Sequence, residues 1–265
     1  METRSPTAHS GNETRPTLLR ACKNKLPMND LLELAVEAHG GLKRWSQLTT
    51  VKASLSITGK LWQLKAQPEA LKDVVVEAQL KRQQLTTHLI AKNRRSVFTP
   101  DRVSIESESG ILEEGRDDPR STFQGQRLET PWDDLHVAYF NSYALWNYLT
   151  IPFLYTYPGF VIEKLATWKE DGEHWRALKV RFPDYIATHT RNQISYFGPE
   201  GLLRRHEYTV DLLGNAPGLN YASDYRNVAG VAVPTKRRVF AYDSEKRKIP
   251  GDPLVAIDIR EIAFS

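Results

Sequence analysis

The residues best suited to chemistry follow a tight turn at residues 198–201 and have the alternation of a β-strand. One face of this strand carries Leu202, Arg204, His206, Tyr208 and Val210. Because both ends of this face are apolar, we expect it to point inward, and its polar middle then needs partners or a ligand. Arg204, His206 and Tyr208 are therefore the candidate catalytic residues, since an imidazole and a phenol can perform acid-base chemistry near neutral pH.

Two interpretations of these inward polar groups remain open. Asp224 or Asp258 on a neighbouring strand could satisfy them, and their role would then be structural. Alternatively, they contact and orient a ligand that the sheet encloses.

An aromatic helix is predicted over residues 131–148, because Thr130, Pro131 and the carboxylates after them form a helix start. Such a helix is buried on most of its circumference or covers a cavity. Tyr139, Tyr143 and Trp146 share one side and are interpreted as cavity lining, although aromatic stripes of this kind also fill cores. The full set of expected ligand-binding residues is Trp132, His136, Tyr139, Tyr143, Trp146 and Tyr225.

No metal or cofactor is expected. Asp133 and His136 have the spacing of carboxylate-bridged metal sites, but such sites need a second pair, and a helix start explains Asp133 equally well. Cys22 is the only cysteine, which excludes an intrachain disulfide and a cysteine-based zinc site. The sequence also lacks a phosphate-binding glycine loop, a nucleophile elbow and an HExxH motif.

The remaining pattern is that of a mostly antiparallel β protein. Asn29 caps a short helix that ends at the Gly40-Gly41 pair. Residues 107–129 are charged and are expected to form a long loop. Strands are expected at about 51–58, 73–79, 85–91, 95–99, 102–106, 161–168, 173–182, 189–197, 201–211, 221–228, 235–242 and 254–264.

Composition and charge narrow the function classes. Residues 1–27 are polar and aperiodic and are expected to be a disordered tail, with residues 28–265 forming a single β-rich ligand-binding domain. Residues 1–28 carry an excess of three positive charges, so only about +1 of the formal +4 belongs to the rest, and nucleic acid is not an expected partner. No apolar run suits a transmembrane helix or a signal peptide, so we expect a cytoplasmic protein.

Three stretches of the sequence resemble the LolA-like lipoprotein-carrier group. They are Ala38-His39-Gly40-Gly41-Leu42 leading into the strand at 51–59, the hairpin at 196–205, and Gly230-Val231-Ala232-Val233-Pro234-Thr235 with the closing strand at 255–264. The resemblance implies a curved antiparallel half-barrel or open barrel, with plugging helices over a hydrophobic cavity. It also implies that the cavity carries or sequesters an apolar ligand.

Three functions fit these observations. The leading one is binding or carriage of a hydrophobic small molecule in an aromatic-lined cup. The second is a cofactor-independent enzyme, such as an isomerase, cyclase or hydratase, that uses His206 and Tyr208 in the same cavity. The third is a protein-interaction module that uses an exposed strand edge. Neither the identity of the ligand nor the oligomeric state follows from the sequence.

Overall fold

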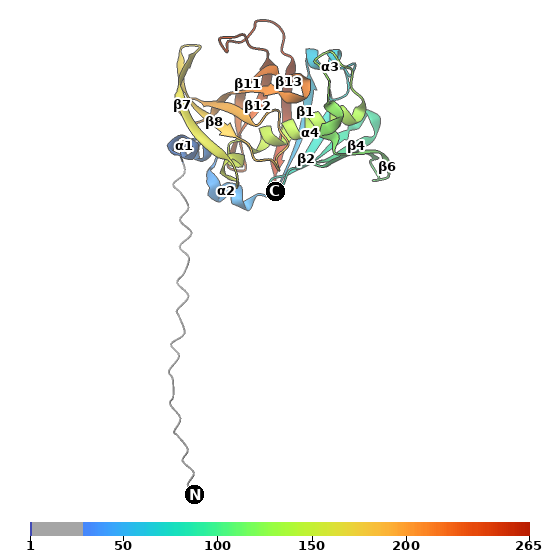
Figure 1. The fold of residues 1–265 in the computed structure, drawn as a ribbon, viewed down its shortest axis with the longest axis horizontal. Helices are drawn as coiled ribbons and strands as arrows, with labels where there is room; N and C mark the ends of the chain where they lie inside the picture. The colour runs from blue at the N-terminus through green and yellow to red at the C-terminus, as the bar shows by residue number, and fades with distance from the viewer. Residues whose placement is uncertain (2–28) are drawn as a thin grey trace.

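A single antiparallel sheet of 13 strands dominates the fold (Figure 1). The structure is a computed structural model that describes residue 1 and residues 29–265, so the tail predicted for residues 1–27 lies, after its first residue, outside the described residues. The strands are β1 (Thr50–Thr58), β2 (Val74–Gln79), β3 (Gln84–Leu89), β4 (Arg94–Thr99), β5 (Arg102–Ser107), β6 (Leu112–Asp117), β7 (Val161–Glu170), β8 (Glu173–Arg181), β9 (Asn192–Phe197), β10 (Leu203–Val210), β11 (Ala216–Val228), β12 (Val231–Phe240) and β13 (Val255–Phe264). The helices are α1 (Asp30–Ala38), α2 (Gly41–Gln47), α3 (Lys60–Leu64) and α4 (Asp134–Thr150), with short 3₁₀ turns η1 (Ile90–Lys92), η2 (Pro119–Phe123), η3 (Phe153–Thr156) and η4 (Asp211–Leu213).

The sheet consists of two meanders that meet in its middle. Its strand order is β6-β5-β4-β3-β2-β1-β13-β12-β11-β10-β9-β8-β7, so every neighbouring pair is consecutive in the chain except β1 and β13. The first and last strands therefore join the two halves. The sheet stays open, with β6 and β7 as its two edges, which confirms the predicted open half-barrel.

Helix α4 connects the two meanders and lies inside the curved sheet (Figure 1). Every residue from Val137 to Thr150 is buried, as expected for a helix with aromatic residues around its circumference. Its buried polar side chains need internal partners. Asn147 Nδ2 donates to the carbonyl of Ala187, and Thr150 Oγ1 donates to the carbonyl of Trp146.

The core follows the predicted alternation in β1, where Val51, Ala53, Leu55 and Ile57 are all buried. The predicted Asn29 cap is also present, since its side chain accepts a hydrogen bond from the Leu31 amide. Two expectations were wrong. The segment expected to be a loop contains strand β6, and α4 begins with Asp133 as its cap in place of Thr130, with Oδ1 accepting from the His136 amide at 2.8 Å.

The three stretches that carry the family resemblance meet in space at the end of α1. Gly40 has a φ of 120°, and a Cβ there would lie 2.1 Å from the carbonyl oxygen of Gly230. A Cβ on Gly201 would lie 2.9 Å from the Cβ of Ala38. Glycine is required at these positions because α1 packs directly against the turns of both hairpins.

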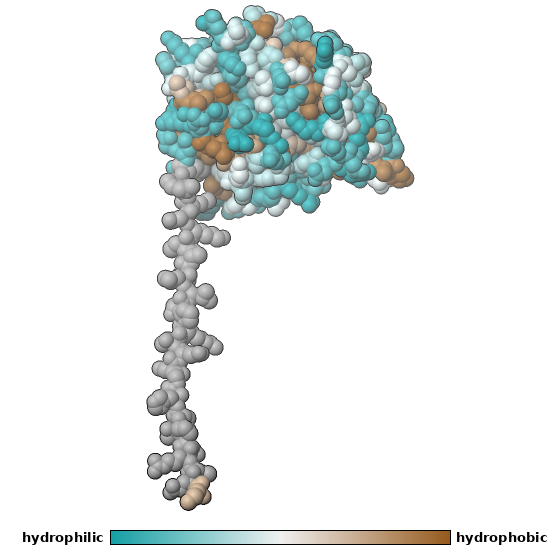
Figure 2. All heavy atoms as spheres, viewed as in Figure 1, coloured by the Kyte–Doolittle hydropathy of each residue, from teal (hydrophilic) through white to brown (hydrophobic). Residues whose placement is uncertain are grey.

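Large exposed apolar side chains are scattered. Figure 2 shows a mostly hydrophilic face on which the hydrophobic areas are small and separate. Within residues 29–265, no helix is both long and apolar enough to cross a membrane. The larger apolar surfaces are therefore internal, between the sheet and α4.

Candidate functional site

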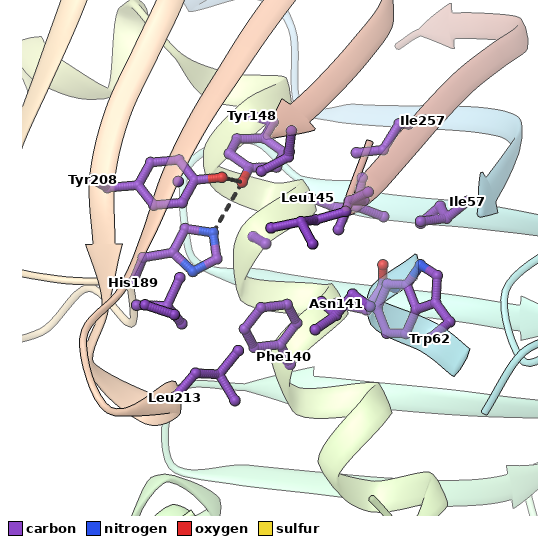
Figure 3. Close-up of a pocket in the computed structure, with 18 of the residues that line it drawn as sticks. Ile57, Trp62, Phe140, Asn141, Leu145, Tyr148, His189, Tyr208, Leu213 and Ile257 are labelled. Carbon is purple, nitrogen blue, oxygen red and sulfur yellow. Dashed lines mark hydrogen bonds between the residues drawn. The ribbon is translucent and has the colours of Figure 1, made fainter. Parts of the chain in front are cut away.

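A small apolar pocket lies between α4 and the part of the sheet formed by β1 and β10–β13 (Figure 3). Helix α3 and the segment around η4 close its sides. Its apolar lining includes Ile57, Leu61, Leu128, Leu145, Leu213, Val239 and Ile257. The pocket has a volume of about 60 Å³, which is room for a few water-sized groups and far less than a bulky ligand needs.

The pocket has one polar end, formed by Tyr148, His189 and Tyr208 (Figure 3). The hydroxyl of Tyr148 lies 2.7 Å from the hydroxyl of Tyr208 and 2.9 Å from Nε2 of His189. The other ring nitrogen of His189, Nδ1, lies 2.9 Å from the hydroxyl of Tyr143. The His189 and Tyr208 rings are stacked with centroids 4.3 Å apart. These contacts hold the polar end in one arrangement.

All groups at the polar end are neutral at neutral pH. Burial, helped by the positive charge of Arg120, lowers the pKa of His189 to about 3. Burial raises the pKa of Tyr148 and Tyr208, and for Tyr208 the neighbouring Tyr148 adds to the increase. The polar end can therefore exchange hydrogen bonds with a ligand but carries no charge of its own.

Two of the three candidate catalytic residues lie near this end, and the third does not. Tyr208 lines the pocket. His206 is buried beside it, with its ring centroid 5.3 Å from that of Tyr208, but it is not among the lining residues. The prediction for Arg204 was wrong, since its side chain is 30 % exposed and pairs with Glu200 at 2.8 Å.

A β-bulge explains why Arg204 does not point inward as predicted. The pairing of β10 with β9 shifts between Leu203 and Arg205, so the alternation breaks at that point. Leu203 turns into the core, and Arg205 turns to the other face of the sheet, where the aromatic rings of Trp168 and Tyr196 cover it. Only the part of the strand after the bulge follows the predicted pattern.

Asp224 and Asp258, the partners expected if His206 has a structural role, do not pair with it. Asp224 pairs with Lys236 at 2.6 Å, and Asp258 pairs with Arg238 at 2.6 Å. Neither carboxylate reaches His206, and both of its ring nitrogens are buried without a hydrogen-bond partner. Burial and the nearby charge of Arg237 lower its pKa well below the usual value, so His206 is neutral.

Trp132 and His136 lie at the start of α4 and do not line the pocket. Trp132 is buried, donates from Nε1 to Gln126 Oε1 at 2.6 Å and packs against Phe140. His136 lies with Nδ1 2.7 Å from Asp133 Oδ1. Among the described residues, no three histidine, cysteine or carboxylate side chains come together as possible metal ligands.

The stripe of Tyr139, Tyr143 and Trp146 lies on a different side of α4 from the pocket. Trp146 is fully buried and donates from Nε1 to the carbonyl of Gln79 at 2.6 Å, and Tyr139 packs against Phe98. The helix does border the pocket, but through a neighbouring side of its circumference. The residues on that side are Phe140, Asn141, Ala144, Leu145 and Tyr148.

Tyr225 also lies away from the pocket. Its hydroxyl donates to the carbonyl of Leu203 at 2.7 Å, and its ring meets the ring of His39 edge-on. The main residue that the sequence prediction missed is His189, in the loop between β8 and β9. A histidine in a loop has no periodic pattern to indicate burial, so its sequence context carried no signal.

No protein-family model matches this sequence, and no curated protein matches it either. Solved structures do match in fold. A DUF1329 family protein from Desulfovibrio piger aligns with a TM-score of 0.50 at 10% identity, covering 89% of this chain and 92% of that one. A putative outer membrane lipoprotein-sorting protein domain from Vibrio parahaemolyticus aligns with a TM-score of 0.50 at 9% identity, covering 88% and 92%. A LolA superfamily protein from Nitrosomonas europaea aligns with a TM-score of 0.49 at 11% identity, covering 89% and 92%.

The predicted cytoplasmic location is contradicted by these matches, because one of them is described as an outer membrane lipoprotein-sorting domain. The prediction rested on the absence of an apolar leader in the sequence, and such an absence is weak ground for a location. The predicted resemblance is confirmed at the level of fold. The chain shares its fold with the matched structures from Desulfovibrio piger and Vibrio parahaemolyticus, and in this chain the fold is an open antiparallel half-barrel with a helix inside its curve.

Proposed function

We propose that this protein binds a small hydrophobic molecule in the pocket between α4 and strands β1 and β10–β13. The observation that carries the proposal is the pocket itself, an apolar space with a single polar end inside a curved sheet. Structures that share the fold include a putative lipoprotein-sorting domain, which agrees with an apolar cargo. Similarity of fold does not by itself indicate a ligand, so the proposal depends on the pocket.

The small volume of the pocket favours a thin ligand. A volume of about 60 Å³ can hold part of an unbranched alkyl chain, whereas a fused ring system needs α4 and the sheet to separate. Asn141, at the pocket wall, has a buried Nδ2 without a partner, which offers a donor to a polar atom of the ligand. The proposed ligand is therefore a single-chain molecule with a polar group.

The enzyme hypothesis receives less support. It uses His206 and Tyr208 together in one cavity, but His206 does not line the pocket, and the third candidate, Arg204, is partly exposed and paired with Glu200. We therefore propose binding without turnover as the function.

The pocket can be tested with 1,6-diphenyl-1,3,5-hexatriene, a neutral, environment-sensitive dye that is a thin rod without fused rings. The wild-type protein is expected to bind it saturably, with one dye per chain. Ala144→Leu places extra methyl groups in the pocket and is expected to weaken binding by at least about tenfold. Fluorescence titration measures the affinity, and thermal unfolding verifies that the variant is folded.

Ala138→Leu is the matched control, because Ala138 is similarly buried on α4 and lies outside the pocket. Both changes add the same side-chain volume at a buried position of α4, and neither is expected to cost more than about 1–3 kcal/mol of stability. Only Ala144→Leu is expected to affect dye binding. Equal weakening in both variants, or in neither, would refute this pocket as the binding site.

A further inference from the structure

A row of buried polar groups lies on the concave face of the sheet, one step beyond the polar end of the pocket. His206 on β10 pairs in register with Asn220 on β11, and Arg237 lies on the neighbouring strand β12. Asn220 is fully buried, and His206 and Arg237 are 1% and 4% exposed. None of these three residues lines the pocket directly.

Most hydrogen-bonding atoms of this row have no partner. Both ring nitrogens of His206, both amide atoms of Asn220 and Nη1 of Arg237 are buried and unpaired. Buried polar groups in folded proteins are nearly always satisfied, so five unpaired atoms in one place call for a ligand or ordered solvent. The row is therefore a layer of buried polar groups with free hydrogen-bonding capacity beside the polar end of the pocket.

The guanidinium of Arg237 also carries a charge that nothing nearby neutralises. Its Nη2 donates to the carbonyl of Tyr148 at 2.9 Å, and the group lies over the Tyr148 ring. Within residues 29–265, no carboxylate forms an ion pair with it, although arginine stays protonated at neutral pH. A buried charge of this kind is unfavourable without a counter-charge.

Arg205 gives the contrasting case on the opposite face of the sheet. Its guanidinium is equally buried, but it pairs with Glu170 at 2.5 Å and with Glu207 at 2.7 Å. This chain therefore supplies carboxylates where a buried arginine is only structural. The missing counter-charge at Arg237 indicates that a negative group comes from outside the chain.

Tyr148 connects this row to the pocket. Its hydroxyl belongs to the polar end, and its ring lies beneath the Arg237 guanidinium. Asn220 lies close enough to the same hydroxyl to lower the pKa of Tyr148 against the effect of burial, although its amide forms no hydrogen bond of standard geometry. The positive field of Arg237 therefore reaches the polar end of the pocket across one aromatic ring.

One hydrogen-bond donor at the polar end has no acceptor within the cluster. Tyr143, His189, Tyr148 and Tyr208 form a chain with three contacts. Three hydroxyls and one neutral imidazole carry four protons, so one proton is left for a group outside the chain. When His189 is protonated at Nε2 and Tyr148 donates to Tyr208, the free donor is the Tyr208 hydroxyl, at the pocket.

We propose that the polar end of the pocket binds the carboxylate of a single-chain amphiphile, whose alkyl chain fills the apolar part. The inference rests on the proposed function and adds the chemical class of the ligand. Tyr208 donates a hydrogen bond to the carboxylate, and Arg237 stabilises its negative charge from behind Tyr148. Arg237 thereby acts as a specificity-determining residue for acids over neutral molecules.

The test compares laurate with 1-dodecanol, which has the same number of carbon atoms and no charge, as competitors that displace 1,6-diphenyl-1,3,5-hexatriene at pH 7.5. The wild-type protein is expected to bind laurate at least about tenfold more tightly than dodecanol. In Arg237→Met this ratio is expected to fall to about one through loss of laurate affinity, with dodecanol affinity unchanged. Arg204→Met, which removes a partly exposed arginine outside the pocket, is the control and is expected to keep the wild-type ratio.

The outcomes separate this inference from the proposed function. If laurate and dodecanol compete equally with the wild-type protein, or if the preference persists in Arg237→Met, the inference is wrong and the apolar pocket stands. If neither the dye nor either competitor binds, both proposals fail. Arg237→Gln removes the same charge with a polar side chain and is the second variant if Arg237→Met does not fold.

Discussion

The hydroxyl groups of Tyr148 and Tyr208 lie 2.7 Å apart, although one residue comes from α4 and the other from β10. This contact ties the helix inside the curve to the sheet around it. It also lies at the polar end of the pocket that α4 and the sheet enclose.

Tyr208→Phe removes this hydrogen bond, and it is expected to lower the free energy of unfolding by about 1 kcal/mol. Laurate binding is expected to weaken several-fold, because the variant also loses the donor at the pocket. Tyr155→Phe is the control, since its hydroxyl pairs with Ser195 at 2.7 Å outside the pocket. It is expected to cost similar stability in urea unfolding with no effect on laurate affinity, and equal weakening in both would contradict the prediction.

Stability is expected to fall as the pH drops below about 6.5. Burial lowers the pKa of His189 to about 3 and that of His39 to about 4, whereas both have ordinary values in the unfolded chain. The unfolded chain therefore binds protons that the folded protein does not, and each histidine costs about 1.4 kcal/mol per pH unit between about pH 6 and 4. Urea unfolding at pH 7 and pH 5 measures the loss.

His189→Asn is expected to remove about 2 kcal/mol of the stability difference between pH 7 and pH 5, because one buried neutral imidazole is gone. His174→Asn, on the exposed end of β8, is expected to leave the difference unchanged. An unaltered pH dependence in His189→Asn would show that this imidazole does not stay neutral in the folded protein.

Arg205 and Arg204 are adjacent residues with opposite environments, so they form a matched pair for mutation. Arg205→Met leaves the buried carboxylate of Glu207 without its guanidinium partner and is expected to cost about 3–5 kcal/mol. Arg204→Met removes partly exposed ion pairs and is expected to cost less than about 1 kcal/mol. Chemical unfolding compares the two, and similar losses would contradict the bulge that separates their environments.

Gly40→Ala is expected to be severely destabilising, because its Cβ would collide with the carbonyl oxygen of Gly230 at 2.1 Å. The loss should exceed about 3 kcal/mol, since the contact involves two backbones that cannot easily move apart. Gly172→Ala has a similar positive φ but no atom within 4 Å, so only backbone strain of about 1 kcal/mol is expected. Thermal unfolding distinguishes the two, and comparable effects would disprove close packing at Gly40.

Local sequence patterns were sufficient for the fold class and for many of its elements, although strand β6 was missed. The alternation in β1, the Asn29 cap and the aromatic run of α4 depend on residues a few positions apart, so they could be recognised without knowing the fold. The glycines at 40, 201 and 230 supported the family resemblance for the same reason. Their close packing at the end of α1 became visible only in three dimensions.

The composition of the site depended on contacts between distant parts of the chain. The bulge in β10 turns Arg204 outward, and it arises from pairing with β9 and has no signature in β10 alone. The side of α4 that faces the pocket depends on how the sheet closes around the helix, so Tyr148 lines the pocket and Trp146 does not. His189 joins Tyr148 and Tyr208 only because the loop between β8 and β9 folds over them, and short-range periodicity contains no information about such contacts.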